Sequence, residues 1–260
     1  MFSLLLPVAG RSSRFPNMRP KWLLTMPDGK LMLEKSIEGL NLDKFDNIIV
    51  ICLREHLDKY VNEQFIIDSF EAATGRKPLL CILEEATSSQ SETIYAALTQ
   101  TGIEGSIFIK DCDNIFSCEP QPINSVATIN LNDIELVDAK NKSYVEVNSL
   151  GVISNIVEKN VISNSFCCGG YGFESVTEFK STFESISSDE EVYISHIIYK
   201  MLLNGKEFRE VHASNYTDWG TLREYRHYCK KHLTLFCDVD GVLLKNGSKF
   251  SKKWLENTSD

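Results

Sequence analysis

The fold is indicated first by residues 4–24, LLLPVAGRSSRFPNMRPKWLL, in which an apolar run leads into a loop of small and basic residues. The continuous apolar character of residues 4–9 is typical of a strand buried on both faces of a parallel sheet. Further apolar runs follow at 47–53, 78–83 and 106–109, and segments of helical period lie between them at 33–40, 55–73 and 93–101. This βαβ alternation predicts a parallel sheet with helices packed on it.

The pattern changes after residue 125, where short alternating stretches such as KSYVEVNSLGVISNIVEK (142–159) predict antiparallel hairpins. Two helices are expected near 175–185 and 190–204, and a strand near 207–213. The sequence thus predicts an α/β fold with a mixed, mostly parallel central sheet.

Composition limits the classes of partner. A chain of 260 residues with 43% hydrophobic content is long enough for one large domain, or for one domain with an appendage. Its formal net charge of -9, without a block of basic residues, argues against nucleic acid and anionic membranes as partners. The first apolar run is short and interrupted by Pro7, so it is neither a signal peptide nor a membrane span. We therefore expect small-molecule partners and a cytoplasmic location.

The 8 cysteines form no C-x-x-C pair, and we expect them to be reduced core thiols rather than zinc ligands. The sequence is compatible with a homo-oligomer but does not define the oligomeric state.

The loop after the first strand has the chemistry of a phosphate seat. Gly10, Ser12 and Ser13 lack bulk, so backbone N–H groups there can approach phosphate oxygens closely. Arg14 and Lys21 supply the positive charge that a nucleoside triphosphate requires. No Walker A lysine follows the loop, and a plain turn after the strand is the alternative interpretation.

Two later segments carry aspartates at the ends of strands. In IFIKDCDNIF (107–116), Asp111 and Asp113 follow a buried strand, at the sheet edge where α/β proteins bind ligands. Carboxylates suit Mg²⁺, which binds through one or two acidic groups together with phosphate oxygens, although an ordinary Asp-Asn turn has the same sequence. In YTDWGTLREY (216–225), Thr221 and Glu224 predict a helix N-cap with a capping box, and Asp218 is a candidate second metal carboxylate.

In this order the motifs resemble those of the sugar-phosphate nucleotidyltransferase family, over roughly residues 3–228. The family's G-x-G-[ST]-R loop is matched by Gly10, Ser12, Ser13 and Arg14, its Pro-Lys by Pro20 and Lys21, its Asp-Asn by Asp113 and Asn114, its Glu-Lys by Glu158 and Lys159, its small-residue turn before an aromatic residue by 169–173, and its Asp-x-Gly-Thr by Asp218, Gly220 and Thr221. The segment ATSSQSETIYAAL (86–98) resembles the base-reading loop and helix of the family. The chain departs from the family at Ser12, which replaces a glycine, and after Lys159, where the usual proline is missing.

The resemblance implies a Rossmann-like three-layer nucleotidyltransferase fold. It also implies an enzyme that joins a nucleoside triphosphate to a phosphorylated small molecule and releases pyrophosphate, supplying an activated precursor for surface polysaccharide. A sugar 1-phosphate is the expected acceptor, a phosphorylated alcohol or amino-acid derivative is the competitor, and the base stays open. Since the attacking phosphate is already ionised, catalysis needs no general base and rests on positioning and charge.

The resemblance also implies a role for each matching residue. The nucleotide contacts are Gly10, Ser12, Ser13, Arg14, Gln90 and Thr93, with Arg14 and Lys21 as the catalytic cations, Glu158, Lys159 and Gly170 as the acceptor contacts, and Asp113, Asp218 and Asp111 as the Mg²⁺ ligands.

Two other functions stay open from the sequence. Asp111-Cys112-Asp113 also spells the D-x-D motif with which many nucleotide-sugar-dependent glycosyltransferases hold Mn²⁺ on a similar fold. A non-catalytic nucleotide-binding module is the third alternative. Release of pyrophosphate discriminates among the three.

The last segment, LTLFCDVDGVLLKNG (233–247), resembles the first motif of haloacid-dehalogenase-type phosphatases, with Asp238 and Asp240 as the matching aspartates. Only about 20 residues follow Asp240, too few for the later motifs of that family. We therefore expect a nucleotidyltransferase domain at 1–230, an incomplete second domain or an appendage at 231–260, and no phosphatase activity.

Overall fold

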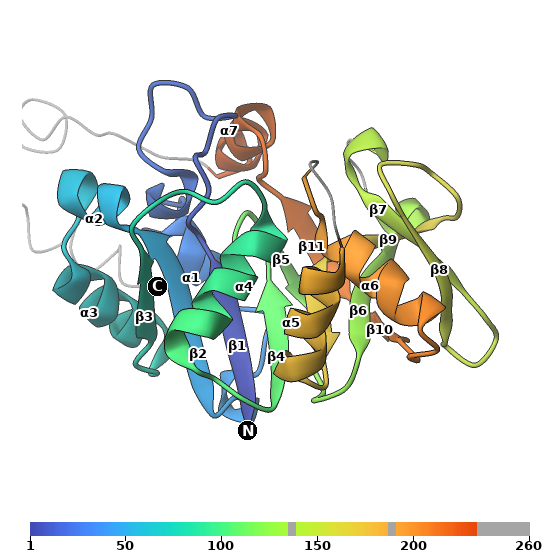
Figure 1. Ribbon diagram of the computed structural model, residues 1–260. Coiled ribbons are helices and arrows are strands. Elements are labelled where there is room, and N and C mark those ends of the chain that lie inside the picture. Colours follow the sequence, from blue (N-terminus) through green and yellow to red (C-terminus); the bar gives the residue numbers. More distant parts are fainter. Residues whose placement is uncertain (135–138, 187–190, 233–260) are drawn as a thin grey trace, which may run out of the picture.

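A mixed nine-stranded sheet forms the centre of the computed structural model, which describes residues 1–134, 139–186 and 191–232 (Figure 1). Seven strands follow one another across it in the order β10, β6, β9, β4, β1, β2, β3, and the hairpin of β7 and β8 joins through β9. Their bounds are β1 Phe2–Pro7, β2 Asn47–Leu53, β3 Leu79–Leu83, β4 Ser106–Lys110, β6 Ser125–Asn130, β7 Ser143–Val147, β8 Ile153–Glu158, β9 Ser165–Phe173 and β10 Arg209–His212.

Six of the seven strands on this path run in the same direction. β1 is parallel to β2 and β4, β2 is parallel to β3, and β6 is parallel to β10. Only β9 is reversed, since it pairs antiparallel with both β4 and β6. The predicted α/β fold with a mixed, mostly parallel sheet is therefore confirmed.

Helices cover both faces of the sheet. The α-helices of the described residues are α1 (Met32–Ser36), α2 (Arg54–Tyr60), α3 (Glu63–Thr74), α4 (Gln90–Thr101), α5 (Val176–Ser185), α6 (Ile194–Leu203) and α7 (Leu222–Lys230), of which α7 packs in a separate cluster above the sheet. α4, α5 and α6 lie on the near face in Figure 1, where they share one hydrophobic core with the sheet, and α1 and α3 share a second core on the other face. This is the predicted three-layer arrangement.

The two cores follow from the twofold period of the strands. On β1, Leu4 and Leu6 point into the core with α1 and α3, and Leu5 points into the core with α4 to α6. Both sides are apolar because both faces are covered, which explains the uninterrupted apolar run of the sequence. None of the described helices is long and apolar enough to cross a membrane.

One predicted helix is divided in the structure. The sequence pattern indicates a single helix at 55–73, but α2 ends at Tyr60 and α3 begins at Glu63. Asn62 caps α3 by accepting a hydrogen bond from the Phe65 N–H at 2.8 Å. The cap satisfies an N–H group that has no partner within the helix, so the chain turns there although the apolar period continues.

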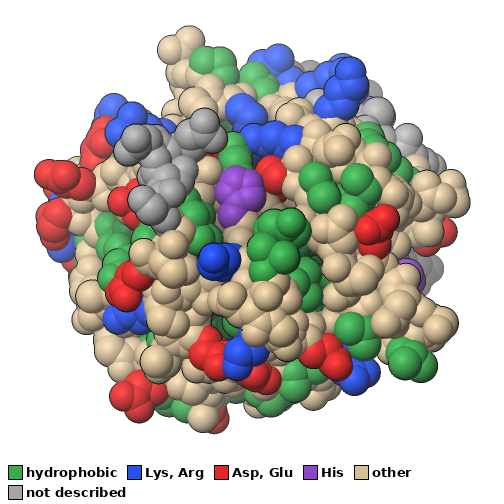
Figure 2. Space-filling view, turned by 45° about the vertical axis from the view of Figure 1, so that its right-hand side comes forward, with side chains coloured by type: hydrophobic (Ala, Val, Ile, Leu, Met, Phe, Trp, Pro, Cys, Tyr) green, Lys and Arg blue, Asp and Glu red, His purple; other side chains and the backbone are tan. Residues whose placement is uncertain are grey.

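Three loops meet at the carboxyl ends of the parallel strands, the upper edge in Figure 1: residues 8–20 after β1, 84–89 after β3 and 111–113 after β4. A two-stranded ribbon of β5 (Asn114–Ser117) and β11 (Ser214–Asp218) adds a fourth segment. In the view of Figure 2, Lys and Arg side chains gather near the same upper edge, although the chain is acidic overall.

Candidate active site

The loop after β1 is shaped by Ser12. This residue has a φ of +51°, in the left-handed region that residues other than glycine adopt uncommonly. Its carbonyl accepts a hydrogen bond from the Phe15 N–H at 2.8 Å, and its hydroxyl accepts one from the Lys21 N–H at 3.0 Å. The hydroxyl thus ties the Pro-Lys segment to the loop, a contact that a glycine at this position could not make.

Lys21 and Arg14 converge on one carboxylate. Lys21 Nζ donates to Asp113 Oδ2 at 2.5 Å, and Arg14 Nη2 lies 3.7 Å from the same oxygen. Burial alone would raise the pKa of Asp113, but Lys21 and then Arg14 hold it well below its ordinary value. The structure therefore brings the two predicted cations together, and their contact with a triphosphate stays a prediction.

A buried lysine that the sequence analysis missed fixes the aspartate loop. Lys110 at the end of β4 has no exposed surface, and its ammonium donates to Asp111 O at 2.5 Å and to Asn114 O and Oδ1 at 3.0 and 2.7 Å. Its Nζ lies 4.4 Å from the centre of the Phe116 ring. Burial lowers the pKa of Lys110. These contacts hold the turn between β4 and β5 in one conformation.

Asp111 faces the first turn of α4. The Gln90 side-chain amide donates to Asp111 Oδ1 at 2.5 Å. Burial and the Asp113 carboxylate raise the pKa of Asp111 to about 6, against the effect of this hydrogen bond. Gln90 thus supports the aspartate loop in this structure, and its predicted contact with a base stays a prediction.

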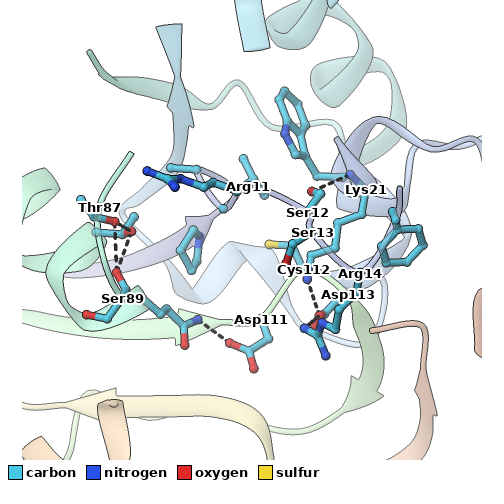
Figure 3. Close-up of a pocket in the computed structure, with 18 of the residues that line it drawn as sticks. Arg11, Ser12, Ser13, Arg14, Lys21, Thr87, Ser89, Asp111, Cys112 and Asp113 are labelled. Atoms are coloured by element: carbon cyan, nitrogen blue, oxygen red, sulfur yellow. Dashed lines mark hydrogen bonds and ion pairs between the residues drawn. The ribbon is translucent and has the colours of Figure 1, made fainter. Parts of the chain in front are cut away.

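A cavity of about 440 Å³ opens between the loop after β1 and the segment that leads into α4 (Figure 3). Thr87 and Ser89 lie on one side of it, Lys21 and Asp113 lie on the opposite side, and Asp111 lies between them. All residues predicted to bind the nucleotide line this cavity, namely Gly10, Ser12, Ser13, Arg14, Gln90 and Thr93. The structure therefore brings the whole predicted nucleotide set together.

β11 carries Asp218 to the aspartate loop. The ribbon pairs Asp218 with Asn114, and the Trp219 N–H donates to the Asp113 carbonyl at 2.8 Å. Thr221 caps α7, and its side chain and that of Glu224 satisfy each other's backbone N–H groups, so the predicted capping box is confirmed. Two aspartates far apart in the sequence thus face each other, as the metal prediction requires.

Gly220 leaves room between these two carboxylates. A Cβ atom at this position would lie 3.0 Å from Asp218 Oδ1 and 3.2 Å from Asp113 Oδ2. Two carboxylates that face one small space suit Mg²⁺, which takes its other ligands from phosphate oxygens and water. No three His, Cys, Asp or Glu side chains of the described residues group as metal ligands, so two carboxylates would leave the other coordination positions of an ion to water and phosphate oxygens. Asp113 and Asp218 fit the predicted ion, whereas Asp111 is turned to Gln90.

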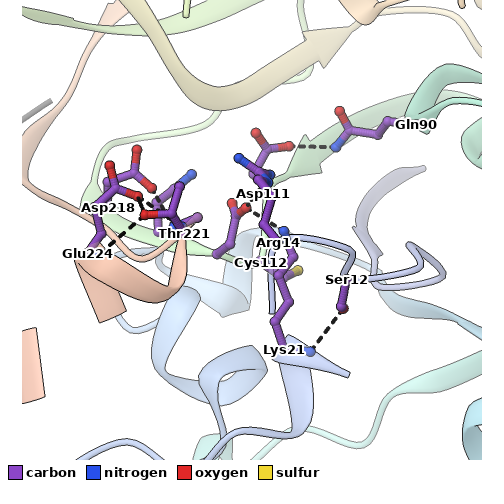
Figure 4. Close-up of polar contacts among 12 residues, drawn as sticks. Ser12, Arg14, Lys21, Gln90, Asp111, Cys112, Asp218, Thr221 and Glu224 are labelled. Atoms are coloured by element: carbon purple, nitrogen blue, oxygen red, sulfur yellow. Dashed lines mark hydrogen bonds and ion pairs between the residues drawn. The ribbon is translucent and has the colours of Figure 1, made fainter. Parts of the chain in front are cut away.

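Asp218 lies beside Thr221 and Glu224 in Figure 4. Lys142 and Tyr216 complete its surroundings, and no motif in the sequence marked either. Lys142 forms an ion pair with Asp218 Oδ2 and donates to the Tyr216 hydroxyl at 2.8 Å. Tyr216 in turn donates to Asp218 Oδ2 at 3.0 Å. Burial opposes the charge of Lys142, but the Asp218 carboxylate outweighs it and raises the Lys142 pKa.

A second cavity, of about 470 Å³, holds the predicted acceptor contacts Glu158 and Lys159. Glu158 accepts hydrogen bonds from the hydroxyls of Ser143 and Ser195, the latter at 2.7 Å. Lys159 Nζ donates to the Tyr193 hydroxyl at 2.6 Å and lies 4.2 Å from the centre of that ring. Serine and tyrosine side chains thus orient both predicted residues, whose contact with an acceptor stays a prediction.

The two adjacent glycines of β9, Gly169 and Gly170, have different surroundings. Gly169 lines the second cavity, and its φ of +93° and the nearby Asp111 side chain leave no place for a Cβ atom. Gly170, the predicted acceptor contact, faces Phe108, Phe116 and Ala127 in the core and lines neither cavity. Core packing therefore accounts for Gly170, and the cavity-lining residue of the pair is Gly169.

The two cavities adjoin. Both are lined by Arg14, Gln90, Asp111, Asp113 and Glu191. Asp113 thus lies where a ligand in one cavity would meet a ligand in the other, and Asp218 lines the second cavity. The aspartates of the phosphatase-like segment, Asp238 and Asp240, lie outside the described residues.

The chain matches no protein-family description and no curated protein by sequence. Solved structures share its fold. A nucleoside-diphosphate-sugar pyrophosphorylase from Vibrio cholerae RC9 superposes with a TM-score of 0.72 at 18% identity, over 87% of this chain and 99% of that one. The inositol-1-phosphate CTP transferase of T. maritima has a TM-score of 0.68 at 17% identity, over 90% and 98%. A UDP-glucose pyrophosphorylase complexed with UDP-glucose has a TM-score of 0.66 at 14% identity, over 88% and 97%. At such identities the likeness shows the fold alone.

Proposed function

We propose that the chain is a nucleotidyltransferase that joins a nucleoside triphosphate to a phosphorylated small molecule and releases pyrophosphate. The observation that carries this proposal is the pair of adjoining cavities, which share Asp113, while Asp218 faces Asp113 from the second cavity. One cavity contains the cationic loop after β1, and the other contains a carboxylate and a lysine set among hydroxyl groups. Enzymes with the same fold, named above, support the proposal by what their names say they act on.

In the proposed reaction a phosphate oxygen of the acceptor attacks the α-phosphorus of the nucleotide. The bond from this phosphorus to the oxygen bridging to the β-phosphate breaks, and pyrophosphate leaves with the electron pair. Arg14 and Lys21 lie at the first cavity, where they meet the charge that develops on the leaving group and on the transferring phosphoryl group. Glu158 and Lys159 orient the acceptor in the second cavity, so that its phosphate lies next to the nucleotide.

The proposal assigns a bound Mg²⁺ to Asp113 and Asp218. When bound, such an ion would neutralise the phosphate oxygens on both sides of the transferred group. The protein contributes the orientation of the two carboxylates: the Gly220 N–H donates to Asp218 Oδ1 at 2.8 Å, and the Trp219 N–H holds the backbone beside Asp113. The Asp-x-Gly turn is therefore a positioning device for the ion.

The identity of the substrates is a narrower part of the proposal. A sugar 1-phosphate is the acceptor we favour, because the Glu158 carboxylate is suited to accept hydrogen bonds from ligand hydroxyls. Synthesis of an activated precursor for surface polysaccharide, in the cytoplasm, would be consistent with that acceptor. The base of the nucleotide stays open.

The decisive experiment measures pyrophosphate release with each of the four nucleoside triphosphates against a panel of phosphorylated acceptors, with Mg²⁺ present. We expect one combination to be turned over, and Asp113→Ala and Asp218→Ala each to lower kcat about a thousandfold. Asp58→Ala, at an exposed position on α2, is the matched control and should behave as the wild type.

Other outcomes favour the alternatives. Sugar transfer from a nucleotide sugar without pyrophosphate release would instead identify a glycosyltransferase that uses Asp111 and Asp113. Nucleotide binding with no turnover of any acceptor would identify a binding module.

A further inference from the structure

Lys142 lies between Asp218, which we assign to the metal, and the second cavity, which we assign to the acceptor. Its side chain is 18% exposed and lines the second cavity, while its ammonium is paired with Asp218, whose side chain is 6% exposed. The same carboxylate faces Asp113 across Gly220. One lysine thus contacts both the carboxylate assigned to the metal and the cavity assigned to the acceptor.

The contacts of Asp218 leave little carboxylate surface for an added cation. Its Oδ1 accepts from the Gly220 N–H at 2.8 Å, and its Oδ2 accepts from Lys142 and from the Tyr216 hydroxyl. A divalent ion beside Asp218 therefore places a second positive charge next to the Lys142 ammonium. Like charges at such short range repel strongly where water is scarce. Lysine has a flexible stem, so the ammonium is the group that can move.

The second cavity offers the displaced ammonium a new partner once an acceptor is bound. A phosphate monoester is a dianion near neutral pH, and it would lie beside Asp218, because its oxygen must reach the nucleotide at the shared wall. Lys159 is less suited to this place, since its ammonium is bound to the Tyr193 hydroxyl, which in turn donates to Glu191 at 2.7 Å.

We propose that Lys142 is a partner-exchanging phosphate ligand: it neutralises Asp218 in the free protein and binds the phosphate of the acceptor when the metal takes Asp218. The proposal rests on the proposed function. A metal bound to Asp218 releases Lys142 for the acceptor phosphate, and a phosphate bound to Lys142 releases Asp218 for the metal. Each ligand therefore raises the affinity of the protein for the other. A purely structural lysine would not do this, since its loss would weaken the site as a whole.

The first test measures Mn²⁺ binding to the free protein by electron paramagnetic resonance, without nucleotide or acceptor. We expect Lys142→Met and Lys142→Gln to bind Mn²⁺ about tenfold more tightly than the wild type, since a competing cation is removed. Lys159→Met and the exposed control Lys140→Met should bind as the wild type. Two replacements are used at position 142 so that a folding defect in one leaves the other informative, and circular dichroism verifies the fold.

The second test separates the substrates kinetically. With the acceptor found by the pyrophosphate assay, Lys142→Gln should raise the acceptor KM about tenfold or more and leave the nucleotide KM within about twofold. Lys159→Met should raise the acceptor KM without the change in Mn²⁺ affinity, and Lys140→Met should change neither quantity.

Opposite results have distinct meanings. Unchanged or weaker Mn²⁺ binding in the folded position-142 variants overturns the exchange, and so does an unchanged acceptor KM. If the wild-type chain releases no pyrophosphate with any acceptor, the proposed function is wrong. The proposal that Lys142 binds the acceptor phosphate is then wrong as well. The Mn²⁺ comparison needs no turnover, so it still decides whether Lys142 holds Asp218 against a metal.

Discussion

Gly220 shows how much of the candidate site depends on a single missing side chain. The residue is buried in the turn that joins β11 to α7, and the space above its Cα is bounded by Asp113, Asp218 and Arg14. Any side chain there would separate the two carboxylates that we assign to one ion. The glycine is needed for this space rather than for its backbone freedom, because its φ is not in the positive range.

We predict that Gly220→Ala loses metal affinity while the fold survives. The added methyl group would lie 3.0 Å from Asp218 Oδ1, so the carboxylates must move apart and Mn²⁺ affinity should fall about tenfold or more. The free energy of unfolding should change by no more than about 1 kcal/mol, since the methyl group meets flexible side chains. Electron paramagnetic resonance and urea unfolding measure the two quantities, with Ser214→Ala on exposed β11 as the control. Wild-type Mn²⁺ affinity in Gly220→Ala would place the metal elsewhere.

At the scale of elements, the segment that follows the loop after β1 is anchored to α2 through one buried pair. The Trp22 indole N–H donates to His56 Nδ1 at 3.3 Å, and both side chains are buried. Trp22 follows directly on Lys21 in the short 3-10 helix Lys21–Leu23, so the pair fixes the segment from which Lys21 reaches Asp113. His56 must stay neutral at Nδ1 to accept this bond.

This pair predicts a pH dependence of stability. Burial lowers the pKa of His56, while in the unfolded chain the ring titrates near pH 6.5. Below that pH His56 binds a proton in the unfolded chain but stays neutral in the folded one. The free energy of unfolding therefore has its full value above about pH 6.5 and falls as the pH decreases. His56→Gln, which keeps an acceptor for Trp22, should remove up to about 1.4 kcal/mol per pH unit of this slope.

Urea unfolding of wild type, His56→Gln and the exposed control His212→Gln between pH 5 and pH 7.5 provides the measurement. Parallel slopes for wild type and His56→Gln would mean that another group causes the pH dependence.

The elements themselves were largely predictable, and the contacts between distant ones were not. Buried parallel strands carry long apolar runs, so β2 could be located from the sequence to the residue and β1 to within two residues. Asp113 could be placed at a strand end for the same reason, whereas β11, which ends at Asp218, has the polar sequence SNYTD and carries no apolar run. Lys142 and Lys110 carry no such signal, because the partner of Lys142 lies 76 residues away on β11 and the partners of Lys110 lie in a turn that only the folded chain defines. Gly170 was assigned to the acceptor from the family resemblance, because the sequence does not reveal its contacts with Phe108 and Phe116 in the core.

At the scale of the whole molecule, the two cavities are lined by segments that lie far apart in the described chain. The shared wall takes Arg14 from the first loop, Gln90 from α4, Asp113 from the loop after β4 and Glu191 from the segment before α6. Asp218 then comes from the β11 ribbon. Since these elements belong to the sheet, to the β5–β11 ribbon and to the helical layer that contains α4 and α6, a ligand held by them binds only to the assembled fold.

We therefore predict that the correct nucleotide stabilises the entire chain against heat. A ligand that binds only the folded state at about 100 times its Kd adds about 2.7 kcal/mol, which for a chain of this size raises Tm by roughly 5–10 °C. Differential scanning fluorimetry with each of the four nucleoside triphosphates and Mg²⁺ should show this shift for the base that the first cavity accepts, and smaller shifts for the others. Lys21→Ala should reduce the shift, because the cation that meets the phosphates is missing, whereas Asp58→Ala should not. Equal shifts for Lys21→Ala and the wild type would show that the nucleotide binds outside the cavity formed by the loop after β1.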